Sequence, residues 1–255
     1  MKPEIQVDSE ALDYRIYVNE NFSQKDFDAW VLEELDVVNG GSVLDIGCGS
    51  GKHLFKIAEK NISGEVFGTD ISLESLNKCK DKIKKDNLKN VFVKKADHTE
   101  LKEKLGDRMF GRVLSSFAIY YTKNPRKTFK DIHDMMSRSG VLFVCGPHSS
   151  NNQGFLELVQ NAGISATEDF VKWTDFLEKK AKPLMKETFG NVQEVVFENP
   201  IVFPDAETLV KYWRATPLYL EEAEGRIERL AREYFKKRGG FVTKKVVSGL
   251  KSVKR

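Results

Sequence analysis

Charge of one sign, cysteine and long apolar runs are all scarce in this sequence of 255 residues. Lysine and arginine number 41 and aspartate and glutamate 38, so the formal net charge is only +3. A histone-like or tail-driven nucleic-acid binder would carry a much larger excess of one sign. The three cysteines, Cys48, Cys79 and Cys145, are too few and too widely spaced for a disulfide framework, and no Cys-x-x-Cys pair indicates zinc.

Two further absences bear on location. The longest apolar stretches, such as residues 141–145, are far shorter than a membrane span requires. The first ten residues, MKPEIQVDSE, contain no apolar segment typical of a secretory signal. Because an odd number of cysteines also fits a reducing compartment, we expect a cytoplasmic protein with no membrane partner.

Apolar residues make up 40% of the chain, which is enough for a sizeable core in one large α/β domain or two small ones. Short apolar runs alternate with segments of helical periodicity, and this alternation predicts βαβ units and a mostly parallel sheet. The expected strands are 42–46, 66–70, 91–93, 112–117 and 141–145. The expected helices between them are 54–58, 72–85, capped by Ser72, and 125–136, capped by Asn124.

The two ends of the chain follow another pattern. A first helix is expected from Ser23, which can cap it, to the stop at residues 39–41. Residues 148–190 are expected to form helices without a strand, followed by a strand at 192–197, helices at 206–214 and 222–237 and an extended segment at 241–253. Since no Ser/Gly linker or internal repeat is present, we expect one domain over residues 1–255. Its parts would be a helical cap (1–41), a core (42–147), a helical lid (148–190) and closing strands and helices (191–255).

The most informative segment, residues 43–53, runs from a predicted strand through a glycine-rich turn into a helix. Glycine allows unusual backbone dihedrals and close approach of a ligand, and the helix start offers unpaired N–H groups. The dinucleotide fingerprint GxGxxG fails because its sixth position is Lys52, and the phosphate loop GxxxxGK[ST] fails because His53 follows that lysine. Asp45, just before the turn, disfavours a pyrophosphate and suits a ligand that carries an ammonium group.

The segment Asp-Ile-Gly-Cys-Gly-Ser-Gly at 45–51 resembles motif I of the class I S-adenosylmethionine-dependent methyltransferases. The resemblance continues through 68–72, 95–98 and 113–121, so that in order and spacing it covers roughly residues 42–147. It implies S-adenosylmethionine as cofactor. It also implies an α/β, Rossmann-like sheet of about seven strands, mostly parallel with an antiparallel last strand, with helices on both faces and a helical insertion after strand 5.

The resemblance also implies roles for individual residues. Asp70 would accept the ribose hydroxyls, Asp97 would contact the adenine amino group, and Asp45 would meet the methionine ammonium directly or through water. The Ser115 and Ser116 carbonyls would face the same ammonium group. The full set of implied cofactor-binding residues is Tyr17, Asp45, Gly47, Gly49, Gly51, Asp70, Ile71, Asp97, His98 and Ser116.

Structural roles for the same residues remain open. Asp45 could interact with a helix dipole, Asp70 could cap the following helix, and Asp97 could be a turn residue. Ser116 could be an ordinary strand-end residue, and Tyr17 could pack within the cap.

Residues for the methyl acceptor are less clearly marked. A general base is useful where the acceptor must lose a proton, and His148 and Tyr120 follow strands at the expected catalytic edge. Arg214 could pair with an acceptor carboxylate or phosphate, because the segment at 212–218 resembles one in small-acid methyltransferases of the trans-aconitate type. The candidates for acceptor binding are Tyr14, Tyr121, Trp213 and Arg214, each of which could instead serve packing.

The favoured interpretation is a methyltransferase that modifies an oxygen or nitrogen atom of a small metabolite, as a monomer or homodimer. An RNA methyltransferase is the alternative that the lysines at 78–95 and 243–255 raise, although those at 78–85 fit the solvated face of a helix. A non-catalytic protein that binds S-adenosylmethionine is the third. No [DN]PP[YFW] sequence follows the fourth strand, which argues against methylation of DNA base amino groups, and no spacing of acids and histidines predicts a metal site.

Overall fold

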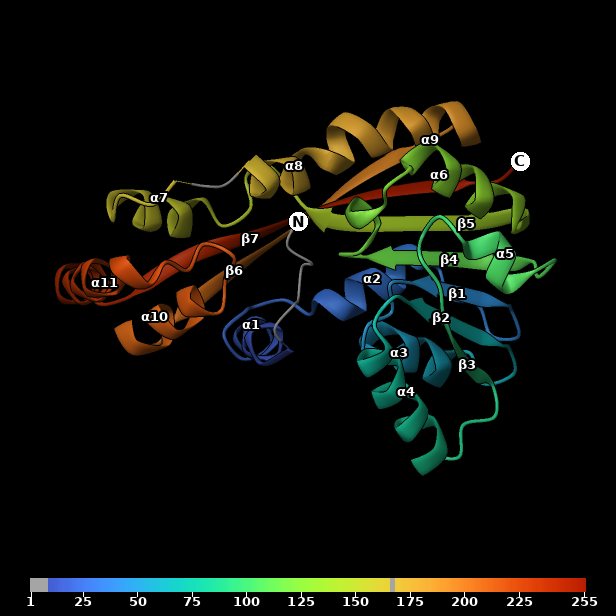
Figure 1. Cartoon of the computed structure of the whole chain (residues 1–255), viewed down its shortest axis with the longest axis horizontal. Helices are drawn as coiled ribbons and strands as arrows, with labels where there is room; N and C mark the ends of the chain where they lie inside the picture. The colour runs from blue at the N-terminus through green and yellow to red at the C-terminus, as the bar shows by residue number, and fades with distance from the viewer. Residues whose placement is uncertain (1–8, 166–167) are drawn as a thin grey trace. The chain divides into compact units, whose positions relative to one another are not determined.

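The computed structural model describes residues 9–165 and 168–255 (Figure 1). Contacts divide the chain into two units. The sheet unit comprises Phe27–His148, Trp173–Val196 and Val247–Arg255, and the helix-rich unit comprises Met1–Asp26, Ser149–Lys172 and Phe197–Val246. The predicted lid at 148–190 is therefore shared between both units, and the prediction of a single domain stays a prediction. Residues 1–8, which carry most of the segment judged for a secretory signal, and residues 166–167 lie outside the described residues.

One seven-stranded sheet has the order β3-β2-β1-β4-β5-β7-β6 (Figure 1). Strand β1 pairs in parallel with β2 and β4, β2 with β3 and β4 with β5, whereas β7 runs antiparallel to β5. The predicted mostly parallel sheet with an antiparallel last strand is thus confirmed. The strands are β1 (Val43–Ile46), β2 (Val66–Asp70), β3 (Val91–Lys95), β4 (Phe110–Ser116), β5 (Met136–Pro147), β6 (Gln193–Phe203) and β7 (Phe241–Val253).

Helices cover both faces of the sheet, as expected. Leu142 and Val144 of β5 join a core cluster with residues of α5 (Leu101–Leu105), α6 (Pro125–Asp134) and α9 (Lys182–Phe189). Phe143, between them, points to the other face because side chains alternate along a strand, and its ring lies 5.4 Å from that of Trp30 in α2 (Phe27–Leu35). Helices α3 (Lys52–Lys60) and α4 (Leu73–Lys85) follow β1 and β2.

Two helix starts were predicted correctly because their caps are local. The Ser75 N–H donates to Ser72 Oγ at 3.2 Å at the start of α4. The Lys127 N–H donates to Asn124 Oδ1 at 3.1 Å at the start of α6, where Pro125 occupies the first turn.

The predicted cap at Ser23 is wrong. Helix α2 begins at Phe27, and Ser23 instead forms an isolated antiparallel bridge with Ile201. The helix ends at Leu35, earlier than the glycines at 40 and 41, because Asp36 adopts a φ of 54° and breaks the helical path. Helix α1 (Ser9–Asn21) was not assigned from the sequence as a separate helix, because its apolar residues are sparse among charged ones.

The helix-rich unit has a core of its own. Trp213 is fully buried there and packs with Phe203, Leu209 and Ile227 in one cluster. The remaining elements of the chain are the 3₁₀ turn Ile119–Tyr121, α7 (Gln153–Asn161), α8 (Glu168–Phe176), the π-helical turn Leu177–Ala181, α10 (Ala206–Arg214), the 3₁₀ turn Glu221–Ala223 and α11 (Glu224–Arg238).

Candidate functional site

The glycine turn at residues 47–51 connects β1 to α3 in a shape that side chains would prevent. All three glycines have positive φ, with values of 73° at Gly47, 55° at Gly49 and 93° at Gly51. A Cβ on Gly47 would lie 2.2 Å from Cβ of Ala118, which is too close for any side chain. A Cβ on Gly49 would meet no atom within 4 Å, so the backbone there faces open space.

Asp70 joins this turn to the end of β2. The Gly49 N–H donates to Asp70 Oδ2 at 2.8 Å, and the Ser72 N–H donates to Asp70 Oδ1 at 2.8 Å. Each carboxylate oxygen keeps a lone pair for a further donor, which a pair of ribose hydroxyls would supply. Ile71, the next residue, is 61% exposed and offers an apolar surface beside the carboxylate.

Asp45 is the most unusual charged residue of the site. It is only 2% exposed, and its Oδ2 atom has no hydrogen-bond partner in the part of the chain that the structure describes. Burial raises the pKa of Asp45 to about 6; His53 lowers it and Asp70 raises it further, both through their charges. A buried carboxylate oxygen without a donor fits the ammonium group of a ligand, and the site therefore fits S-adenosylmethionine in its donor and acceptor chemistry.

Asp97 and His98 follow β3 at the same edge of the sheet. Asp97 Oδ1 accepts hydrogen bonds from the backbone N–H of Thr99 at 2.9 Å and from its hydroxyl at 2.7 Å. Burial alone would raise the pKa of Asp97, but these two bonds outweigh it and hold the pKa below its ordinary value. Burial lowers the pKa of His98, which is therefore neutral at pH 7, and its Nε2 lies 3.6 Å from where a Cβ of Gly47 would be.

Strand β4 contributes two serines whose side chains differ in role. Ser115 is fully buried, and its hydroxyl donates to the carbonyl oxygen of Ile46 at 3.0 Å, which ties β4 to β1. The Ser116 hydroxyl lies 3.4 Å from the sulfur of Cys145 on β5. Phe117, the next residue, has a φ of 53°, a strained value that turns the chain away from the sheet. The contact that the resemblance implies between the Ser116 carbonyl and the ammonium group of the cofactor stays a prediction.

His148 lies just past β5 and contacts a carboxylate that the sequence did not reveal. Its Nε2 atom lies 2.9 Å from Glu178 Oε1. Glu178 belongs to the π-helical turn at Leu177–Ala181, an irregularity that often marks functional sites but leaves no readable sequence pattern. The pair resembles the base-plus-orienting-carboxylate arrangement used in acid–base catalysis.

Aromatic residues lie after β4 in the same unit. The rings of Tyr120 and Tyr121 are 4.5 Å apart, and the Tyr121 ring lies 5.7 Å from that of Trp173. Tyr120 packs against the core cluster, whereas Tyr121 is exposed. Of the two tyrosines, Tyr121 thus has the surface available for a ligand, and the roles predicted for both stay predictions.

Asp28 of α2 was missed by the sequence reasoning. It is buried, and its carboxylate lies 3.2 Å from His53 Nε2, 3.3 Å from Lys52 Nζ and 2.5 Å from Lys56 Nζ. Burial by itself raises the pKa of Asp28, but the bonds from His53 and Lys56 reverse this and hold it well below its ordinary value. Its only signal in the sequence is an acid in the apolar stripe of a helix.

Four candidates lie in the helix-rich unit. The Tyr14 and Tyr17 rings are stacked 5.8 Å apart, and the Lys211 ammonium lies 4.7 Å from the centre of the Tyr14 ring. The buried Trp213 indole donates to the carbonyl oxygen of Leu218 at 3.1 Å, which favours a packing role. Arg214 forms ion pairs of 2.9 Å with Glu224 and 3.1 Å with Glu228. Their assignment to cofactor or acceptor stays a prediction.

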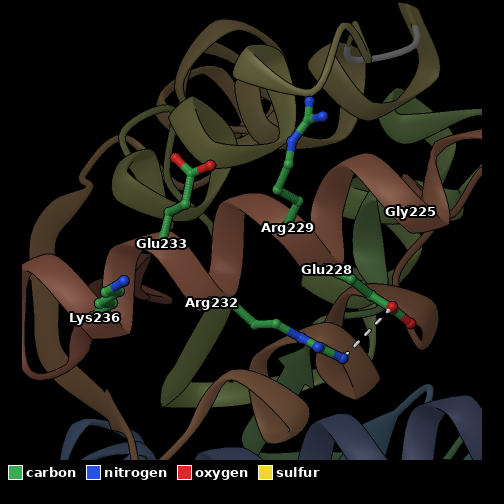
Figure 2. Close-up of a pocket in the computed structure, with 6 residues that line it drawn as sticks. All are labelled: Gly225, Glu228, Arg229, Arg232, Glu233 and Lys236. Carbon is green, nitrogen blue, oxygen red and sulfur yellow. Dashed lines mark ion pairs between the residues drawn. The ribbon is translucent and has the colours of Figure 1, made fainter.

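Two surface depressions are lined by residues that are distant in sequence from the glycine turn. One, of about 380 Å³, is lined by residues of α11; in Figure 2 the side chains of Arg229 and Glu233 point to one side of this helix and those of Glu228 and Arg232 to the other. Arg232 and Glu228 form an ion pair of 4.0 Å there. The other, of about 530 Å³, is lined by Tyr14, Tyr17, Asp205, Glu207, Thr208 and Lys211.

Two kinds of feature are absent from the described ranges, 9–165 and 168–255. No helix in them is both long and apolar enough to cross a membrane. No group of three or more histidine, cysteine, aspartate or glutamate side chains in them is arranged to hold a metal ion.

Comparison with known proteins places this geometry in a family. A family model described as a methyltransferase domain matches residues 38–194. The chain is 33% identical over 112 residues to (S)-tetrahydroprotoberberine N-methyltransferase of Eschscholzia californica, a match that covers 44% of this chain and 31% of that protein. It is 32% identical over 119 residues to an uncharacterised protein of Haemophilus influenzae, covering 46% of each. The chain thus spans about a third to a half of the length of the curated relatives it matches.

Solved structures share the fold at low identity. A coclaurine N-methyltransferase bound to N-methylheliamine and S-adenosylhomocysteine aligns with a TM-score of 0.57 and 18% identity, covering 100% of this chain and 83% of that one. The YcgJ protein of Bacillus subtilis aligns with a TM-score of 0.63 and 13% identity, covering 89% and 97%. Because the family model matches well over half of the chain, and the sheet order and glycine turn agree with it, the chain belongs to the class I S-adenosylmethionine-dependent methyltransferase family.

Proposed function

We propose that this chain binds S-adenosylmethionine at the glycine turn and transfers its methyl group to a nitrogen or oxygen atom of a small molecule. The observation that carries the proposal is the buried Asp45 carboxylate, whose Oδ2 atom has no donor among the described residues and which lies just before the glycine turn in the chain. When bound, S-adenosylmethionine supplies a methyl group on a positively charged sulfur, which makes that carbon open to attack by a nucleophile.

The residues at the strand ends would hold the cofactor from three sides. Asp45, mostly ionised at pH 7 with a pKa of about 6, would accept from the ammonium group. Asp70 would accept from the ribose hydroxyls through the lone pairs that Gly49 and Ser72 leave free. Asp97 would accept from the adenine amino group, and Ile71 would cover a face of the ring.

An amine is the acceptor class that the site supports best. Amines arrive protonated at pH 7, so a base must remove a proton before the nitrogen can attack. His148 can accept that proton, and the Glu178 carboxylate, 2.9 Å from His148 Nε2, would orient the imidazole. The exposed Tyr121 ring offers a face that attracts a cation. That several relatives carry N-methyltransferase names supports the same choice.

Calorimetric titration with S-adenosylhomocysteine tests the cofactor part. We expect the parent chain to bind, and Asp45→Asn to bind at least about tenfold more weakly, because the amide loses the charge that pairs with the ammonium group. Asp86→Asn is the matched control, since Asp86 lies just after α4 and pairs there with the exposed Lys82. Equal binding by Asp45→Asn, or no binding by the folded parent, would refute the proposal.

Turnover distinguishes an enzyme from a non-catalytic binding protein. We expect release of S-adenosylhomocysteine with a small amine. His148→Asn should lower kcat by roughly 10²–10⁴-fold with little change in cofactor affinity. Folded protein that binds the cofactor but turns over no acceptor in an amine panel would favour the binding-protein alternative.

Cellular context follows from the same proposal. The chain would act in the cytoplasm, as a monomer or homodimer, on a small molecule and not on nucleic acid. Binding to RNA that persists at moderate salt would revive the RNA alternative, since weak electrostatic binding vanishes there.

A further inference from the structure

Two of the three cysteines converge beside the glycine turn and take no part in the proposed transfer. Cys48 belongs to the turn itself and Cys79 to α4; both are buried and free. Sγ of Cys79 lies 3.3 Å from the carbonyl oxygen of Gly49, and Sγ of Cys48 lies 3.7 Å from the same oxygen. Two thiols from separate elements therefore converge on one backbone carbonyl.

The two sulfurs have room because two neighbouring residues are glycines and carry no side chain. A Cβ on Gly51 would lie 3.1 Å from Cys79 Sγ, and a Cβ on Gly68 of β2 would lie 2.8 Å from Cys48 Sγ. Side chains at these positions would push the sulfurs aside. The pair thus fills a compartment bounded by the turn, by β2 and by α4.

The thiols also interact with each other. The side-chain hydrogen bond between them lowers the pKa of Cys79 and raises that of Cys48, because one sulfur acts as donor to the other. A thiolate is the form that reacts with oxidants, so a contacting pair in which one member ionises more readily is suited to oxidation.

Gly49 connects this pair to the cofactor site. Its carbonyl oxygen accepts from the thiols, and its N–H donates to Asp70 Oδ2 at 2.8 Å. Movement of the sulfurs would therefore move Gly49. Gly49 in turn positions the Asp70 carboxylate, which is expected to bind the ribose hydroxyls.

We propose that Cys48 and Cys79 form a reversible disulfide in the presence of a peroxide, and that this bond weakens cofactor binding at the glycine turn. The first part stands on the thiol geometry alone, whereas the second rests on the proposed function.

The reaction is a two-electron oxidation of the thiol pair. One thiolate attacks an oxygen of hydrogen peroxide, the O–O bond breaks, and a sulfenic acid and hydroxide form. The sulfur of the second cysteine then attacks the sulfenic sulfur. The S–S bond forms, the S–O bond breaks, and the departing oxygen takes the thiol proton and leaves as water. In total the pair loses two protons and two electrons, and the peroxide becomes two waters.

The bond would disturb the turn for two reasons. A disulfide has a sulfur–sulfur distance of about 2.05 Å, shorter than a thiol–thiol contact, so closure draws the turn toward α4. The S–H of Cys79, whose sulfur lies 3.3 Å from the Gly49 carbonyl oxygen, is also lost as a donor to that oxygen. Because coupling is reciprocal at equilibrium, bound cofactor should in turn make the disulfide easier to reduce.

The first experiment treats the folded full-length chain with hydrogen peroxide and measures intact mass and cross-linked peptides. We expect loss of two hydrogen atoms, a peptide joining Cys48 to Cys79, and full reversal by dithiothreitol. Cys145→Ser should behave like the parent, because Cys145 lies on β5. Cys79→Ser should form no intramolecular disulfide, and Cys48→Ser serves as a second variant if Cys79→Ser does not fold. Over-oxidation without a Cys48–Cys79 link would overturn the proposal.

The second experiment titrates S-adenosylhomocysteine into reduced and oxidised protein. We expect the Kd to rise at least about tenfold on oxidation of the parent and to be unaffected by peroxide in Cys79→Ser. Equal affinity of the reduced and oxidised parent would overturn the effect on binding. Failure of the reduced parent to bind would instead refute the proposed function, while the mass experiment would still decide the disulfide.

Discussion

Asp45 is a buried carboxylate, and one of its oxygens meets no donor in the part of the chain that the structure describes. Without a ligand this position costs stability, because burial favours the protonated form and raises the pKa from 3.8 to about 6. A residue kept at such a cost is typical of a binding site, where the ligand supplies the missing partner.

The pH dependence of stability should reveal this cost. Because the folded pKa of Asp45 lies above the unfolded one, the folded state binds more protons between pH 4 and 6, and stability from this group falls as pH rises through that window. Asp45→Asn should therefore gain roughly 3 kcal/mol of unfolding free energy, relative to the parent, between about pH 4 and pH 7. Urea denaturation at both pH values measures it. Asp86→Asn provides the comparison, and a difference independent of pH would contradict the assignment.

Gly47 shows how close approach constrains a residue. In Gly47→Ala the new Cβ would meet Ala118 at 2.2 Å, in addition to the strain of a φ of 73°. We expect the unfolding free energy to fall by about 1–3 kcal/mol, and binding of S-adenosylhomocysteine to be lost as the turn shifts.

Gly190→Ala separates the two effects. Gly190 also has a φ of 73°, but a Cβ there would meet no atom within 4 Å. The Gly190→Ala variant should lose only the part of the unfolding free energy that the strained φ costs, and it should still bind S-adenosylhomocysteine. Equal losses in the two variants would show that the contact with Ala118 is unimportant.

At the scale of elements, Asp28 holds α2 to α3. One carboxylate of α2 contacts three basic side chains at the start of α3, the helix that the glycine turn opens. The arrangement fixes the direction in which the turn enters its helix, although Asp28 itself is not assigned to any ligand.

Loss of this charge should destabilise the sheet unit. Asp28→Asn is expected to lower the unfolding free energy by about 1–3 kcal/mol, because a buried charge-assisted network loses its negative charge and one of its two acceptor oxygens. Asp36→Asn, which removes only an exposed partner of Arg112, should cost at most about 1 kcal/mol. Thermal denaturation of both variants measures the difference, and equal small effects would argue against a structural role for Asp28.

At the scale of the whole molecule, the sheet unit and the helix-rich unit each have a hydrophobic cluster, and strands β6 and β7 run through both. Continuous strands would transmit unfolding from one unit to the other. We therefore expect a single cooperative transition, as the prediction of one domain implies.

Calorimetry of Trp213→Ala tests that expectation. The fully buried indole should cost about 3–5 kcal/mol when removed from the helix-rich unit. If the units unfold together, the one transition shifts as a whole. A second, unshifted transition belonging to the sheet unit would contradict the single domain.

The sequence by itself determined the order of strands and helices in the core, two helix caps and the glycine turn with its three acids. These features are local, because alternation, caps and turn glycines act over a few neighbouring residues. Only the tertiary structure decided which distant side chains meet. The His148–Glu178 pair, the buried position of Asp28 and the convergence of Cys48 and Cys79 all join separate elements. The same reason explains the error at Ser23, whose local capping pattern was overridden by pairing with Ile201, far along the chain.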